Sequence, residues 1–251
     1  MYLIFDTETT GLPRNFNAPI SDLDNWPRVV QLAWQLHDDS GELISQQDFI
    51  IHPEGFNIPF ESERVHGIST ELAQAVGERL TDVLALFNKD LSRAKFMVGH
   101  NLRFDLNVMG AEYLRLGQET PLTLPVLDTC TENSAQLCQI PGGRGGKFKL
   151  PTLTELHQHL FGEAFNEAHN ATADVESTTR CFLELLRKEH YSLEEILQEP
   201  GYFESFRTLN PGPIQKIGLQ HVNLKAESEK LRAAKRPTQG PAAAKSSAQL
   251  A

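Results

Sequence analysis

The sequence has few cysteines and no long apolar run. Its three cysteines are an odd number and form no C-x-x-C pair (Cys130, Cys138 and Cys181). This pattern argues against a disulfide framework or a zinc site, and it predicts reduced thiols and a cytoplasmic protein. No stretch approaches the roughly 20 apolar residues of a membrane-spanning helix, so no membrane association is expected. The apolar N-terminal run is interpreted as a strand rather than a signal peptide.

Positive charge is also scarce. The chain of 251 residues has 23 Lys and Arg against 33 Asp and Glu, a net charge of −10. Without a strong basic footprint, avid binding of free nucleic acid is not expected. The glycine-rich stretch at 141–149, PGGRGGKFK, is not a Walker A loop, because Phe148 stands where Ser or Thr is required. We interpret it as a flexible surface loop, and the alternative is a basic flap that contacts a phosphate backbone.

Three short segments carry the residues with the most specific chemistry. Their sequences are FDTETTGL at 5–12, VGHNLRFD at 98–105 and HNATAD at 169–174. Together they offer four carboxylates and a histidine: Asp6, Glu8, Asp105, Asp174 and His169. Hydrolysis of a phosphodiester requires hard cations held by oxygen ligands and a base that works near neutral pH. These residue types fit that requirement.

The expected elements bring these side chains together. Asp6 and Glu8 are two positions apart at the end of an apolar strand, so both side chains leave the same face. Asp105 lies in the first turn of a helix expected at 103–116, and Asp174 near the start of one that ends near 188. A lone Asp-x-Glu pair is more often a solvated strand end, but the combination in this order favours a metal site.

Four carboxylates at one point would repel one another without counter-ions, and oxygen ligands favour Mg²⁺ or Mn²⁺ over zinc. His169 precedes Asp174 by five residues and is the candidate general base.

The element order predicts an α/β fold with a mixed sheet. Strands are expected at 29–37 and 43–52 around the turn DDSG, and with residues 2–6 they form a three-stranded antiparallel meander. Alternating helices and strands follow, with helices at 70–76, 79–93, 103–116 and 152–161 and strands at 95–99 and 125–130. This is the order of an RNase H-like fold.

The three segments resemble the exonuclease motifs of the DEDDh (DnaQ-like) family of 3′→5′ exonucleases, and within it the proofreading epsilon subunits of bacterial DNA polymerase III. VHGI at 65–68 and the pair Asp128-Thr129 match further family segments, and the resemblance covers about residues 1–190. Two features depart from the family: Gln31 stands where Glu is frequent, and the stretch 15–26 is longer than expected.

The resemblance implies an RNase H-like fold and a site with two metal ions. Asp6, Glu8 and Asp174 would hold the ion that activates water. Asp6 would also bridge to a second ion placed with the help of Asp105, and His169 would be the general base.

The resemblance also implies contacts to the substrate. Thr7 and Thr9 would meet the terminal nucleotide, and Leu12 would wedge beside the last base. Leu12 could instead be a loop residue that caps the core. His66 and Asn101 are candidate pocket residues, with a turn histidine and a structural asparagine as the alternatives.

We expect an exonuclease domain at 1–190, a short helical or irregular extension at 191–222 and a disordered tail at 223–251. The tail is rich in Ala, Lys, Ser and Pro, and it could be a tether to a partner or a solvated end. The leading hypothesis is metal-dependent 3′→5′ proofreading of single-stranded DNA 3′ ends, with a DNA polymerase subunit as partner. An RNA-trimming exoribonuclease and a non-catalytic module that stabilises a polymerase are the alternatives.

Overall fold

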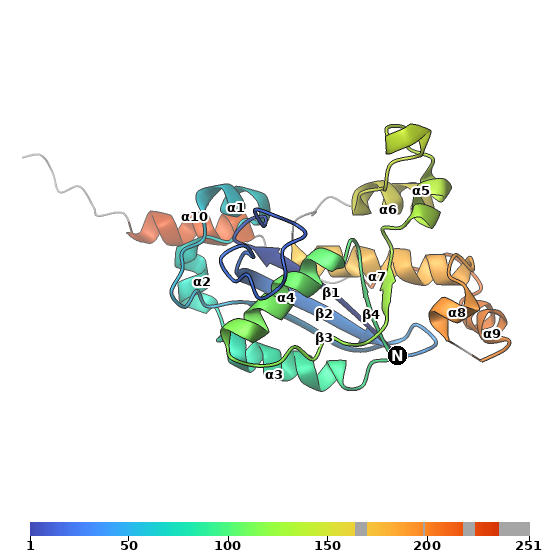
Figure 1. Ribbon diagram of the computed structural model, residues 1–251, viewed down its shortest axis with the longest axis horizontal. Helices are drawn as coiled ribbons and strands as arrows, with labels where there is room; N and C mark the ends of the chain where they lie inside the picture. The colour runs from blue at the N-terminus through green and yellow to red at the C-terminus, as the bar shows by residue number, and fades with distance from the viewer. Residues whose placement is uncertain (164–169, 198, 218–223, 236–251) are drawn as a thin grey trace, which may run out of the picture.

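The computed structural model describes residues 1–163, 170–197, 199–217 and 224–235. A five-stranded sheet with the order β3-β2-β1-β4-β5 forms its centre (Figure 1). The strands are β1 (Tyr2–Thr9), β2 (Val29–His37), β3 (Leu43–Ile50), β4 (Phe96–Gly99) and β5 (Val126–Asp128). The pairs β1–β2 and β2–β3 are antiparallel, whereas β1–β4 and β4–β5 are parallel. The predicted meander and mixed sheet are confirmed.

The sheet is covered on both faces because successive β1 side chains point in opposite directions. Phe5 packs edge-on against Phe87, with ring centroids 5.3 Å apart, in a cluster shared with α3 and α4. Tyr2 meets Phe182 of α7 at 5.0 Å in a second cluster on the other face. Strand β1 is thereby held between two helical layers.

The helices expected from the sequence near 70–76, 79–93, 103–116 and 152–161 are present, and α1, α5 and α9 were not predicted. The helices in the described ranges are α1 (Phe60–His66), α2 (Thr70–Val76), α3 (Leu80–Leu91), α4 (Arg103–Arg115), α5 (Glu132–Cys138), α6 (Leu153–Phe161), α7 (Ala171–Arg187), α8 (Leu193–Ile196), α9 (Tyr202–Leu209) and α10 (Leu224–Lys235), with a 3-10 turn at Arg144–Gly146. None of them combines the length and apolar character that a membrane crossing requires. All three cysteines lie in the described ranges and are free.

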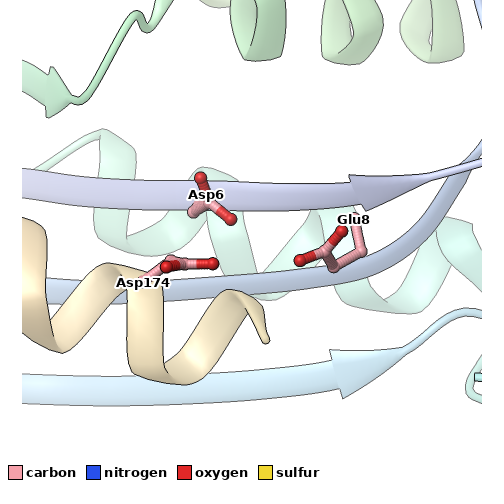
Figure 2. A group of neighbouring side chains, drawn as sticks. All are labelled: Asp6, Glu8 and Asp174. Carbon is pink, nitrogen blue, oxygen red and sulfur yellow. The ribbon is translucent and has the colours of Figure 1, made fainter. Parts of the chain in front are cut away.

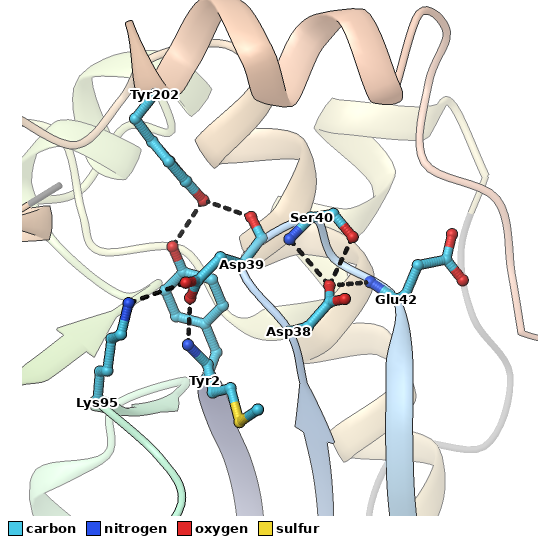
Figure 3. A network of polar contacts seen from close by, with 8 residues as sticks. Tyr2, Asp38, Asp39, Ser40, Glu42, Lys95 and Tyr202 are labelled. Carbon is cyan, nitrogen blue, oxygen red and sulfur yellow. Dashed lines mark hydrogen bonds and ion pairs between the residues drawn. The ribbon is translucent and has the colours of Figure 1, made fainter. Parts of the chain in front are cut away.

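The segment after α7 packs against the amino end of β1. Tyr202 of α9 shares a 2.6 Å hydrogen bond with the hydroxyl of Tyr2 and donates to the main-chain oxygen of Asp39 at 3.1 Å. The Asp39 carboxylate also pairs with Lys95 at 2.8 Å and with the amino group of Met1 (Figure 3). Helix α9 is thus fastened to the β2–β3 turn, at the opposite end of β1 from its carboxylates.

Helix α10 lies in a segment for which the sequence predicted disorder, and that prediction is wrong for residues 224–235. Ser228 is 2% exposed, donates to the main-chain oxygen of Gly67 at 2.6 Å and accepts from the Ser69 amide at 3.1 Å. Leu224 and Leu231 pack against a small cluster under α2. Composition alone missed this helix because two leucines and one serine make its contact face. The rest of the predicted tail, residue 223 and residues 236–251, lies outside the described ranges.

Candidate active site

Three of the four predicted carboxylates converge at the carboxyl end of β1. Asp6 and Glu8 leave the same face of β1, and Asp174 comes from the first turn of α7. One oxygen from each carboxylate lies within 4.8 Å of the others, and the three groups point toward one another (Figure 2). An all-oxygen set of this kind suits a hard divalent cation.

The start of α7 is fixed by contacts that no motif indicated. The Asn170 side chain caps the helix by accepting from the Thr172 amide at 3.1 Å. The Ala171 amide donates to the side-chain oxygen of Gln31 at 3.3 Å, and the Gln31 side-chain amide donates to Asp48 at 2.8 Å. The Thr172 hydroxyl completes the arrangement by donating to the other Asp48 oxygen. Strands β2 and β3 therefore position the turn that carries the third carboxylate.

This arrangement gives the departure at Gln31 a role. Gln31 is 1% exposed and uses both ends of its amide, as an acceptor for α7 and as a donor to Asp48. A glutamate at this position could not donate to Asp48. The sequence signal that could have found the network is a glutamine inside an otherwise apolar strand, because a buried polar side chain requires partners.

Burial and mutual repulsion perturb the cluster. Burial, followed by the charges of Asp105, Asp174 and Glu8, raises the pKa of Asp6 well above its ordinary value. Burial, with the charges of Asp174 and Asp105, raises the pKa of Glu8 to about 8. The site is thus short of positive charge, and it would bind either protons or a cation at neutral pH.

Asp105 adjoins this cluster but is not a member of it. It lies in the first turn of α4, is 5% exposed, and accepts from both the amide and the hydroxyl of Thr7, at 3.1 and 2.6 Å. Burial raises its pKa to about 7, and the two hydrogen bonds from Thr7 act in the opposite direction. Thr7 therefore holds one Asp105 oxygen, while the Asp105 charge is still felt by Asp6 and Glu8.

The loop before α4 is held by Asp128. Its carboxylate accepts from the main-chain amides of Asn101 at 2.8 Å, Leu102 at 2.9 Å and Cys130 at 2.8 Å. Asn101 has a left-handed backbone with φ of 60°. The sequence showed Asp128 only as part of a family segment, and the structure shows it as the group that fixes the turn leading to Asp105.

His169, the predicted general base, lies outside the described residues, and its role remains a prediction. The helix that follows it does begin where expected, since α7 starts at Ala171.

The predicted substrate residues have different surroundings. Leu12 is 74% exposed, which disfavours the alternative that it caps the core. Thr9 is 8% exposed and its hydroxyl donates to the Gly11 oxygen at 2.7 Å. His66 ends α1, is 4% exposed and accepts from the Ile68 amide at 3.1 Å. Their contacts with a nucleotide, and those of Thr7 and Asn101, stay predictions.

Comparison with known proteins agrees with this geometry. A family model described as exonuclease (RNase_T) matches residues 3–182. The chain belongs to this family of DEDD exonucleases. It is 30% identical over 196 residues to a PolC-type DNA polymerase III of Pediococcus pentosaceus, covering 77% of this chain and 12% of that protein. It is 31% identical over 189 residues to a DNA polymerase III subunit epsilon-like protein of Rhodobacter capsulatus, covering 74% of this chain and 23% of that protein.

The exonuclease domain has the predicted RNase H-like fold. Exonuclease I of E. coli, in a structure with a 5cy-dT13 oligonucleotide, superposes with a TM-score of 0.58 at 20% identity, covering 82% of this chain and 43% of that one. The chain spans less than a quarter of the length of the two polymerase relatives above.

Proposed function

We propose that this exonuclease is metal-dependent and removes nucleotides from the single-stranded 3′ end of DNA, as a proofreading activity that works with a DNA polymerase in the cytoplasm. The observation that carries the proposal is the group of Asp6, Glu8 and Asp174 oxygens within 4.8 Å of one another. Three partly buried carboxylates this close together repel one another, and a bound cation would offset that repulsion.

The residues present fit Mg²⁺ or Mn²⁺. The donors are carboxylate oxygens, and burial together with repulsion raises the pKa of both Asp6 and Glu8. A bound cation would offset this repulsion in place of bound protons. Asp6, Glu8 and Asp174 would hold one ion, and Asp6 with Asp105 would help to place a second. Bound in pairs, such ions stabilise the charge on the attacking and leaving oxygens of a phosphodiester.

The surrounding residues would do the rest. Thr7 would keep Asp105 oriented through its two hydrogen bonds. His169 would take the proton of the attacking water, and Leu12, exposed on the loop after β1, would contact the terminal base. The preference for DNA and the polymerase partner are supported by the relatives, which are named as DNA polymerase III proteins.

The proposal is tested with matched DNA and RNA oligonucleotides that carry a 5′ label. With Mg²⁺ the DNA should shorten one nucleotide at a time, the label should stay on the shrinking strand, and EDTA should stop the reaction. Faster digestion of RNA would show a ribonuclease, and release of the label in the first product would show the opposite polarity.

Variants connect the activity to the site. Asp6→Ala should abolish hydrolysis, because it removes the ligand shared between both ions, and Asp174→Asn should cost nearly as much. A rate above about a tenth of wild type in either variant under saturating Mg²⁺ would contradict the assignment of the site.

A further inference from the structure

The stretch 15–26, longer than expected for the family, belongs to the loop between β1 and β2, and internal hydrogen bonds hold this loop together. Its two ends meet, since the Thr10 amide donates to the Arg28 oxygen and the Arg28 amide donates to the Thr10 hydroxyl, both at 2.9 Å. Inside the loop, the Asn25 side chain accepts from the Asn15 main-chain amide at 2.8 Å and donates to the Asn15 main-chain oxygen at 3.0 Å. The loop is a closed unit at the end of the strand that carries the catalytic carboxylates.

This loop is fastened to α4. The Arg115 guanidinium donates to the main-chain oxygens of Leu23 and Trp26, at 2.7 and 2.6 Å. Gly110 of α4 leaves room for Ile20, whose side chain would lie 3.3 Å from a Cβ at that position. In Figure 1 the loop is the dark-blue segment beside α4 and α1. Such fastening keeps the exposed residues of the loop in fixed positions.

The loop encloses a depression of about 430 Å³ next to Leu12. Arg14, Arg28 and Arg115 line it together with Asp24. Glu112 pairs with both Arg28 and Arg115, so these three arginines and two acids leave one net positive charge. In a chain with a net charge of −10, this is a local excess of positive charge beside the active site. An anionic ligand is therefore favoured here.

One wall of the depression is a flat cationic surface. The Arg28 guanidinium lies over the ring of Phe56, 4.3 Å from its centroid, and is held by Glu112 at 2.8 Å. The Arg28 side chain is 28% exposed, so part of it remains accessible. Planar guanidinium groups supported in this way are surfaces on which unpaired bases stack.

We propose that this depression binds the single DNA strand upstream of the 3′-terminal nucleotide, with a base stacked on Arg28 and a phosphate held by Arg14. The proposal rests on the exonuclease function and extends it, because it assigns the long loop to substrate binding. The depression opens beside Leu12, so a strand whose last base meets Leu12 can continue into it. A base that is paired in a duplex could not present its face to Arg28.

The test uses two variants with different signatures and a matched control. Arg28→Lys keeps the positive charge and removes the planar guanidinium group. Glu112 still pairs with Arg115 at 3.2 Å in this variant, so its buried carboxylate keeps a partner. Arg14→Gln removes a charge from an exposed position. Arg79→Gln removes a charge from another exposed position, 68% exposed, at the start of α3. Melting temperatures show whether each variant folds as the wild type does.

Binding is measured by fluorescence anisotropy with 5′-labelled dT10 and an abasic ten-mer of equal charge, with Ca²⁺ in place of Mg²⁺. The wild type should prefer dT10 about five-fold or more, and Arg28→Lys should remove that preference without changing the salt dependence. Arg14→Gln should lower the slope of log Kd against log salt by about 0.7, the value for one phosphate contact on a single strand. Arg79→Gln should resemble the wild type.

Turnover of saturating dT2 separates this proposal from the proposed function. It should be unchanged in the Arg79→Gln control, because both the catalytic carboxylates and the depression are intact there. Equal affinity of the wild type for dT10 and the abasic strand, or wild-type binding by both loop variants, would overturn the proposal. A loss of dT2 turnover in Arg28→Lys or Arg14→Gln as large as the loss of dT10 affinity would also overturn the proposal. It would show that the loop acts on the catalytic site. If the wild type hydrolyses no dT2, the proposed function fails, while the binding results still decide the role of the loop.

Discussion

At the scale of single residues, the raised pKa values of Asp6 and Glu8 would make the proposed metal binding depend on pH. The pKa of Glu8 is raised from its ordinary 4.5 to about 8, mainly by burial. A raised pKa favours the protonated form in the folded state, so its contribution to stability is present below about pH 4.5 and is lost as the pH rises toward 8. In EDTA, we therefore expect the melting temperature to fall by at least about 2–4 °C between pH 5 and pH 8, which corresponds to about 1 kcal/mol for a chain of this size.

Millimolar Mg²⁺ should remove most of this decline at pH 8, because a bound cation stabilises the charged carboxylates. Glu8→Gln is the control, since it removes one of the titrating carboxylates and should make the decline in EDTA shallower. A melting temperature that does not respond to Mg²⁺ at pH 8 would contradict a cation site at these carboxylates.

His169 is the other single residue whose role can be decided by titration. A general base must be neutral, so kcat should rise with pH through an apparent pKa near the ordinary value of about 6.5. His169→Ala should lower turnover roughly 10²–10⁴-fold while metal and DNA binding persist. The measurement is kcat against pH for both proteins, with Mn²⁺ titration of each. Loss of metal affinity in the variant, or an unchanged acidic limb at a near-normal rate, would show that His169 is not the base.

At the scale of elements, the contacts of Gln31 make the position of α7 depend on β2 and β3. Gln31→Glu would place a second carboxylate against Asp48 and lose a donor, so we expect a cost of about 1–3 kcal/mol in unfolding free energy and a lower kcat. Adding Asp48→Asn should restore both the unfolding free energy and kcat, because an asparagine can donate to the new glutamate. Thr208→Val is a control, since that exposed hydroxyl donates to the main-chain oxygen of Glu204 within α9, away from the start of α7. A double variant no better than Gln31→Glu would disprove this coupling.

The same contacts show where sequence reasoning reaches its limit. Strand β1 and its carboxylate pair were predictable because a buried apolar run and a period of two are local signals. Helix α1 was missed, and it follows Pro59, which makes no side-chain cap. The Gln31–Asp48–Thr172 arrangement joins positions up to 141 residues apart in the chain. A glutamine inside an apolar strand is its local signal, and that signal does not show which residues are the partners. Pairings of that kind depend on the register between strands, which the sequence does not show directly.

At the scale of the whole molecule, helices from the C-terminal part lie at both ends of the sheet. Helix α9 is fastened at the amino end of β1, whereas α10 lies beside α1 and α2 at the other end (Figure 1). The chain has a net charge of −10, and three of its 23 Lys and Arg residues line the depression beside Leu12. Affinity for a free DNA end should be modest, which agrees with the proposal that a polymerase partner supplies the substrate.

Truncation after residue 222 tests how far α10 belongs to the exonuclease domain. Loss of the helix exposes the apolar cluster under α2 and leaves the buried Ser69 amide without the Ser228 hydroxyl. It also removes Arg232, which pairs with Glu63 and with Glu71. We expect the melting temperature to fall by several degrees while kcat on dT2 at 20 °C stays within about two-fold, because the proposed catalytic residues all precede residue 175. Truncation after residue 235 is the matched control and should leave both unchanged. Loss of kcat in the shorter protein, measured well below its melting temperature, would instead show that α10 acts on the site. The route would be the loop that follows α1, because Ser228 bonds Gly67 there, two residues before Ser69, which caps α2.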